Sequence, residues 1–186
     1  MRKNFGAKAI CYPMPVLMIA TYNEDGTPDI MNAAWGGISN DTEISICMGE
    51  NHKTTQNLKN RKAFTVSMGD EKHMVACDYV GIVSGKDVPD KFARAGFTAE
   101  KSELVDAPMV KEFAITLECR MISYDEKTCR LVGEIVNVSA DESVLGDNGK
   151  IDPLKAGLIT YDPVNHKYIR LGEIVGNAFG DGAALK

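Results

Sequence analysis

The chain of 186 residues has the length of one domain, and its 44% hydrophobic and 25% charged residues are typical of a globular protein. Its formal net charge is -5, and an acidic chain without a basic run repels a phosphate backbone, which argues against a nucleic-acid partner. No apolar run reaches the roughly 20 residues of a membrane span. The N-terminal stretch lacks a convincing signal-peptide cleavage site, so we expect a cytoplasmic protein without membrane contact.

The first elements predicted along the chain form a β-hairpin. An apolar strand covers residues 15–22, the segment "NEDGT" supplies Asp-Gly turn chemistry, and a second strand begins at Pro28 or Asp29. Residues 43–48, "EISICM", alternate apolar and polar side chains and predict a further strand.

A short helix is predicted in "TTQNLKNRK", with Thr54 or Thr55 as its N-cap. The segment "AFTVSM" at 63–68 has the β-branched and aromatic residues of a strand. Two more short helices are expected at 71–81 and 89–96.

The second half is richer in predicted β-structure. Long strands are expected over 113–125 and 128–141, and shorter ones over 157–162 and 167–175. Several antiparallel strands interrupted by helices indicate a mainly β fold, a barrel-like core with short helical insertions. Because no repeat or linker divides the chain, we expect one domain over residues 1–186.

Several common chemistries have no motif in this sequence. The five cysteines, at positions 11, 47, 77, 119 and 129, are odd in number and form no C-x-x-C pair, and most lie in apolar surroundings, so we expect reduced and mainly structural thiols. The three histidines lack metal-ligand spacing. A P-loop, a complete G-x-G-x-x-G fingerprint and a G-x-S-x-G elbow are missing too. We therefore expect no metal site and no catalytic triad.

The stretch "IMNAAWGG" holds the only tryptophan, Trp35, among residues that have almost no side chain. The neighbours Ala33, Ala34, Gly36 and Gly37 leave room beside the indole ring. Either a ligand or another part of the protein fills that room.

Two further segments carry cationic side chains near predicted helix starts. His52 and Lys53 lead into Thr54 and Thr55, where free backbone N–H groups and the positive end of the helix dipole favour a phosphate. A capped surface helix is the commoner arrangement for such a segment. The loop within 81–98 carries Lys86 and Lys91, which suit an anionic ligand or the polar edge of a ring, although ordinary surface charge is the commoner role of such lysines.

Taken in series, these segments resemble a known family. The chain contains "P-V-x-x-I-x-T-x-N-x-D-G-x-P", then "N-A-A-W", "H-K-T-T-x-N-L", "SGKDVPDKF", "A-P-x-x-x-E", "L-E-C" and the tail "Y-x-x-L-G-E-x-V-G-x-A-F". In this order, over nearly the whole chain, they are similar to the flavin reductase-like FMN-binding proteins, and most closely to the flavoredoxin group. The resemblance implies an FMN-binding split β-barrel and a homodimer with the flavin near the subunit interface.

The resemblance also implies a set of cofactor-binding residues. Backbone and small side chains of Asn32, Ala33 and Ala34 lie along the flavin in such proteins, with Asn32 at a ring heteroatom and Trp35 flanking the ring; the alternative is that Trp35 fills the barrel or the dimer interface. The phosphate-binding residues correspond to these four: His52, Lys53, Thr54 and Thr55.

One of these positions departs from the pattern, because related flavin reductases often carry arginine where this chain has His52, and Lys53 then has to supply the charge. The resemblance further implies ring-edge or phosphate contacts from Ser84, Lys86 and Lys91, within one subunit or across the interface. Tyr161 is either a flavin contact or a core or interface tyrosine.

The function that this implies is an FMN-dependent oxidoreductase. It passes electrons from NAD(P)H or a redox partner protein through bound FMN to a flavin or small acceptor. The alternative is a flavoredoxin-type electron carrier that holds FMN without nicotinamide-dependent turnover. The third possible function is that of a barrel that no longer binds the cofactor and has a structural or ligand-sensing role.

Overall fold

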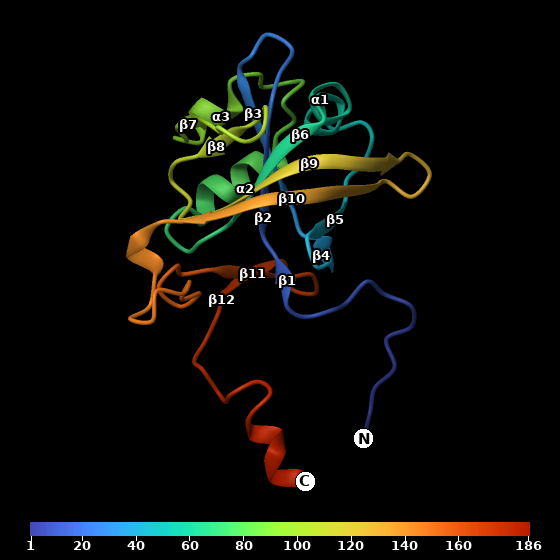
Figure 1. Ribbon diagram of the computed structural model, residues 1–186. Helices are drawn as coiled ribbons and strands as arrows, with labels where there is room; N and C mark the ends of the chain where they lie inside the picture. The colour runs from blue at the N-terminus through green and yellow to red at the C-terminus, as the bar shows by residue number, and fades with distance from the viewer.

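A computed structural model describes residues 1–186, and its main feature is a curled sheet of seven antiparallel strands (Figure 1). In spatial order these are β3 (Pro28–Ala33), β2 (Leu17–Tyr22), β6 (Ala63–Met68), β9 (Ile115–Asp125), β10 (Arg130–Ala140), β5 (Glu43–Cys47) and β4 (Gly36–Asn40). The prediction of a mainly β, barrel-like fold with few helices is confirmed.

The other elements surround this sheet. They are the helices α1 (Lys53–Arg61), α2 (Met74–Ile82) and α3 (Lys91–Arg94), the 3-10 turns η1 (Glu142–Val144) and η2 (Asp181–Leu185), the sheet of β1 (Met14–Pro15), β11 (Ile159–Asp162) and β12 (Lys167–Arg170), and the pair β7 (Ala99–Lys101) and β8 (Pro108–Val110). No helix is long and apolar enough to cross a membrane.

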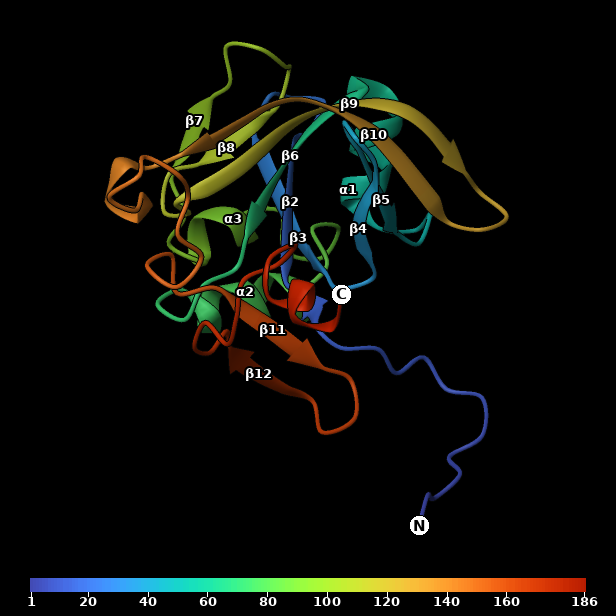
Figure 2. The ribbon, with the colours of Figure 1, turned by 60° about the horizontal axis from the view of Figure 1, so that its bottom comes forward.

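The strand order explains the curl of the large sheet. β3 and β4 lie at opposite edges of the sheet, yet only Ala34 and Trp35 separate them along the chain. The two edges must therefore approach each other at this junction, which closes one end of a half-barrel (Figure 2). At Gly36 a Cβ atom would lie 3.0 Å from Leu17 and Ile46 side-chain atoms, so the close approach of the strands there favours glycine.

β2 shows why its sequence is almost continuously apolar. Leu17 and Ile19 point into the core cluster inside the half-barrel, whereas Met18 and Ala20 belong to a second cluster together with residues of α2 and α3. Both faces of this strand are buried, so it lacks the alternation of a surface strand.

The sequence-based elements agree with the structure in type more often than in extent. The predicted hairpin is β2–β3, and the strands predicted at 43–48 and 63–68 are β5 and β6. The strand predicted over 167–175 is wrong beyond Arg170, where the chain loses its partner strand. The predicted helices 71–81 and 89–96 shorten to α2 and α3.

Two features were not expected. The strand β4 has two glycines and exposed side chains, so its sequence lacks the apolar alternation that predicts a strand. The strands β7 and β8 are only three residues long each, and the structure identifies them by their pairing with each other.

Among the cysteines, Cys77 and Cys119 are buried, but Cys11 and Cys47 are exposed and Cys129 is half-buried. The expectation that most cysteines lie in apolar surroundings is therefore wrong.

Candidate functional site

A cavity of about 510 Å³ lies where the β3–β4 junction, the start of α1 and the segment after α2 meet. This volume is in the range of small-molecule and cofactor sites. Ten of the twelve cofactor-binding residues predicted from the sequence line it: Asn32, Ala33, Ala34, Trp35, His52, Lys53, Thr54, Ser84, Lys91 and Tyr161.

Two predicted residues lie off the cavity wall. Thr55 is fully buried beneath it, and its hydroxyl donates to the carbonyl oxygen of Gly49 at 2.8 Å, which holds the turn before α1. Lys86 is exposed and lines an adjoining polar groove together with Lys53 and Gly85.

The N-terminus of α1 offers unused hydrogen-bond donors to the cavity. The backbone N–H groups of Lys53, Thr54 and Thr55 donate to no acceptor in the protein, and no side chain caps the helix at His52. The prediction of a threonine cap is wrong, because both hydroxyls make other hydrogen bonds: that of Thr54 donates to Asp29 Oδ2 at 2.6 Å. The Lys53 ammonium has no ion-pair partner, so donors and a positive charge meet at one end of the cavity.

Asp29 organises the elements around this end, and sequence reasoning read it only as the start of a strand. Its carboxylate is 2% exposed, accepts the Thr54 hydrogen bond and lies 3.8 Å from Lys91 Nζ. A Cβ atom at Gly85 would come within 2.5 Å of Asp29 Oδ1, so the loop after α2 can pack here only with glycine. One carboxylate on β3 thus joins α1, α3 and that loop.

Lys91 is a buried cation of the same subunit. Its Nζ donates to the carbonyl oxygens of Val80 at 3.3 Å and Val83 at 3.2 Å, at the C-terminal end of α2, where a helix favours positive charge. Burial lowers the pKa of Lys91, and the neighbouring Asp29 charge opposes that shift. These partners hold the Lys91 side chain, 3% exposed, in one position on the cavity wall.

His52 reaches the surface beside Lys53, but it adds little positive charge at neutral pH. Partial burial, followed by the positive charges of Lys91 and Lys86, lowers the pKa of its imidazole. The lysines that line the cavity are Lys53 and Lys91.

Aromatic side chains line the cavity from two different elements. Trp35 follows β3, is 57% exposed and touches the cavity, which excludes the interpretation that it fills the barrel interior. Tyr161, on β11, is half-buried, and its hydroxyl lies 2.8 Å from His166 Nδ1. Asn32 uses its amide nitrogen to donate to the carbonyl oxygen of Cys77 at 3.1 Å, which ties β3 to α2.

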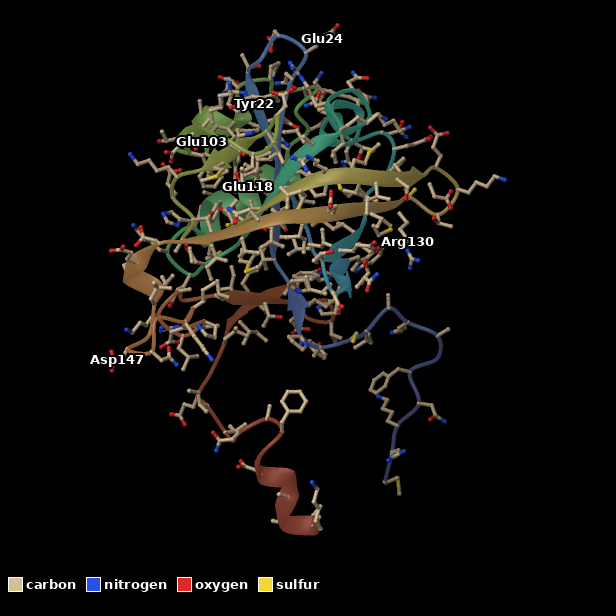
Figure 3. The ribbon with its side chains drawn as sticks, in the orientation of Figure 1. Tyr22, Glu24, Glu103, Glu118, Arg130 and Asp147 are labelled. Atoms are coloured by element: carbon tan, nitrogen blue, oxygen red, sulfur yellow. The ribbon has the colours of Figure 1, made fainter.

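The cavity also contains residues that sequence reasoning assigned no role. Cys47, at the end of β5, and Cys129, just before β10, both line it. The register pairs Cys47 with Arg130, which Figure 3 marks at the start of β10. This strand pairing brings the two cysteines to one wall of the cavity. The spacing of the cysteines in the sequence does not predict that they lie there together.

Comparison with known proteins places this geometry in a family. The family model of the flavin reductase like domain matches residues 9–158, so the chain belongs to the flavin reductase-like family. The fold is thus that of a flavin reductase-like split barrel.

Within that family the chain is similar to flavoredoxins. It is 38% identical to the flavoredoxin of Desulfovibrio vulgaris (Miyazaki F), with a TM-score of 0.94 over 98% of this chain and 100% of that one. The flavoredoxin from Methanosarcina acetivorans is 26% identical, with a TM-score of 0.88 over the full length of both chains. An FMN-binding domain of a flavin reductase-like enzyme from Shewanella baltica is 17% identical, covers 88% of each chain and shares the fold with a TM-score of 0.78.

Proposed function

We propose that the protein binds FMN in this cavity and acts as an oxidoreductase. The observation that carries the proposal is that two residues with free backbone N–H groups, Lys53 and Thr54, line one end of a cavity of about 510 Å³, where the Lys53 side chain also has no ion-pair partner. Such an arrangement favours a phosphate group. Membership of the flavin reductase-like family supports a flavin as the ligand that carries this phosphate.

The cavity walls fit the other parts of this cofactor. Small side chains at Ala33 and Ala34 leave room along the β3–β4 junction, and Trp35 stands beside that room. A flat ring against an aromatic side chain is a favourable contact. Ser84 and Lys91 line the wall formed by the loop after α2 and by α3, where a hydroxyl and a cation suit the polar edge of a flavin ring.

When bound, FMN supplies hydride and one-electron chemistry, and the chain supplies position and electrostatics. Lys91 keeps a positive charge inside the cavity because Asp29 and two carbonyl oxygens surround its ammonium. That charge favours a negatively charged form of the ligand. Asp29 in turn holds Thr54, so the phosphate end and the ring end are fixed by one buried carboxylate.

The electrons come from NAD(P)H or from a redox partner protein and pass to a flavin or a small acceptor. Anaerobic mixing of FMN-loaded protein with NADH or NADPH, followed at the visible flavin absorbance, tests the nicotinamide branch. Bleaching that saturates with nicotinamide concentration supports turnover as a reductase. No bleaching by either nucleotide, in protein that dithionite reduces fully, excludes that branch.

A second candidate function is that of a flavoredoxin-type electron carrier, which holds FMN and exchanges electrons only with proteins. The similarity to two flavoredoxins over at least 98% of this chain favours it. The same experiment separates the two candidates, because a carrier is bleached by a reduced protein donor such as ferredoxin and remains oxidised with nicotinamide.

We further propose that the protein is a homodimer. An uncharged groove of about 370 Å³ borders the β3–β4 junction on the side of β1 and β11. Its walls include Leu17, Ile38, Met68 and Leu158, and Ile38 is 67% exposed. An apolar hollow with a strongly exposed apolar side chain beside it is suited to an interface with another protein. Light scattering during size-exclusion chromatography tests the proposal, and a stable FMN-loaded monomer contradicts it.

A further inference from the structure

Residues 172–186, here called the C-terminal arm, extend away from the rest of the protein (Figure 1). Every residue of the arm is exposed, including the apolar Ile174, Val175, Phe179 and Leu185. Val175 and Phe179 are as accessible as in an unfolded chain, at 100% and 110%. Figure 3 shows the side chains of this segment surrounded by no other part of the chain.

The arm nevertheless has a structure of its own. Asn177 donates its backbone N–H to Asp181 Oδ2 at 2.8 Å, Asp181 donates its own N–H to the carbonyl oxygen of Asn177 at 3.1 Å, and η2 follows. The last backbone hydrogen bond to the body runs from Leu171 N to Leu158 O at 3.0 Å, and no ion pair joins arm and body. An ordered segment with bare apolar side chains lacks the burial that normally stabilises such order.

The uncharged groove lies where the arm begins. Leu171, the residue before the arm, lines this groove together with Leu158, Gly37 and Ile38. A neighbouring hollow shares Ile38, Met68, Leu117 and Leu158, so the apolar surface extends along the open side of the large sheet. The arm leads away from this surface instead of covering it (Figure 1).

We propose that the C-terminal arm of one copy lies in the uncharged groove of a second copy, with Val175 and Phe179 as its apolar anchors. The inference rests on the proposed homodimer and assigns a role to the tail motif, which the cofactor site does not use. The eight residues from Gly172 to Phe179 span at most roughly 28 Å when extended, enough to cross onto a partner docked at the groove.

A second copy satisfies both surfaces at once. Each chain has an uncovered C-terminal arm and an apolar groove, and a two-fold dimer exchanges them reciprocally. Because each arm starts at the rim of the groove, it meets the partner as soon as it leaves its own body. The groove lining contains no charged residue, which matches apolar anchors and excludes a charged peptide as the preferred occupant.

Photo-crosslinking of the full-length, FMN-loaded protein tests the exchange directly. Benzoylphenylalanine replaces Phe179, and unlabelled and nitrogen-15-labelled copies are mixed before illumination. Crosslinked peptides of mixed isotope composition that contain residues 36–40 or Met68 are the expected result. Crosslinks confined to a single isotope, or to other surfaces, overturn the proposal.

A pair of variants supplies the second readout. Phe179→Ser should raise the dimer dissociation constant at least tenfold, whereas Leu104→Ser, which removes an exposed aliphatic side chain near β7 and β8, should leave it unchanged. A dimer that Phe179→Ser does not weaken overturns the arm exchange and leaves the homodimer standing. A monomeric wild type overturns both, and the FMN titration of the same samples reports separately on the cofactor.

Discussion

Two hollows flank the β3–β4 junction, and their linings differ more than their sizes. The cavity of about 510 Å³ has Lys53, Lys91 and free backbone donors on its walls, whereas the groove of about 370 Å³ has no charged residue at all. The volumes alone therefore do not say what either hollow binds. The donors and charges that each hollow leaves unpaired decide what it can hold.

The difference arises from the elements that meet at each hollow. A helix N-terminus opens into the cavity, and its first backbone N–H groups have no partner within the helix. Antiparallel strands form much of the groove, and their backbone groups largely pair with neighbouring strands, so apolar side chains dominate its surface.

The largest expected effect concerns the buried charge of the cavity. Lys91→Met leaves the Asp29 carboxylate buried without its cation, and we expect the free energy of unfolding to fall by about 3–5 kcal/mol. Urea unfolding followed by circular dichroism measures the loss. Lys86→Met, an exposed lysine of the adjoining groove, is the control and should stay close to wild type. Equal midpoints for the two variants contradict the role of Lys91.

A charge placed in the groove should break the dimer. Ile38→Asp puts a carboxylate on an uncharged surface, and we expect the dimer dissociation constant to rise roughly a hundredfold or more because that carboxylate has to be desolvated. Analytical ultracentrifugation gives the constant. Ile122→Asp, at an exposed site on β9 that lines neither hollow, should leave it unchanged. A dimer that tolerates Ile38→Asp means that the groove is not the interface.

Removal of the Lys53 side chain should weaken FMN binding without affecting dimerisation. Lys53→Ala loses a charge-assisted contact worth about 1.5–3 kcal/mol, so we expect a dissociation constant for FMN higher by roughly tenfold to a hundredfold. The matched control is Lys59→Ala at the other end of α1, where the ammonium lies 2.5 Å from Glu126. If both variants bind FMN like wild type, the phosphate does not lie at α1.

The smallest effect is a pH dependence from His52. The protein lowers the pKa of this imidazole, so between that value and the ordinary value of about 6.5 the unfolded chain binds more protons than the folded one. The stability of cofactor-free protein should therefore fall as the pH drops below about 6.5. His52→Gln should flatten this part of the curve, and an unchanged slope in the variant contradicts the assignment.

The sequence predicted those parts of the molecule that depend on local chemistry. The hairpin with its Asp-Gly turn lies as expected. The residues at the start of α1 and the Asn32–Trp35 segment line one cavity, and their contacts with a flavin stay predictions. The sequence did not predict the role of Asp29, because this residue contacts Thr54 of α1 and Lys91 of α3, which approach it only in the folded chain. The threonine hydroxyls were misassigned for the same reason, since their acceptors lie outside the helix.

Strand pairing was beyond local reasoning as well. Cys47 and Cys129 reach one wall of the cavity only because β5 pairs with β10. The tail pattern was visible in the sequence, but its apolar side chains Ile174, Val175 and Phe179 are exposed in a single chain. The expectations of a single domain and of a cytoplasmic location stay predictions.

The central claim, that FMN occupies the cavity beside Trp35, is tested most directly by titrating flavin-free protein with FMN. Visible absorbance and tryptophan fluorescence are recorded together, and because Trp35 is the only tryptophan, the emission reports on this one site. We predict saturable binding of one FMN per chain with strong quenching that follows the same curve. The absence of any saturable change in either signal contradicts the claim.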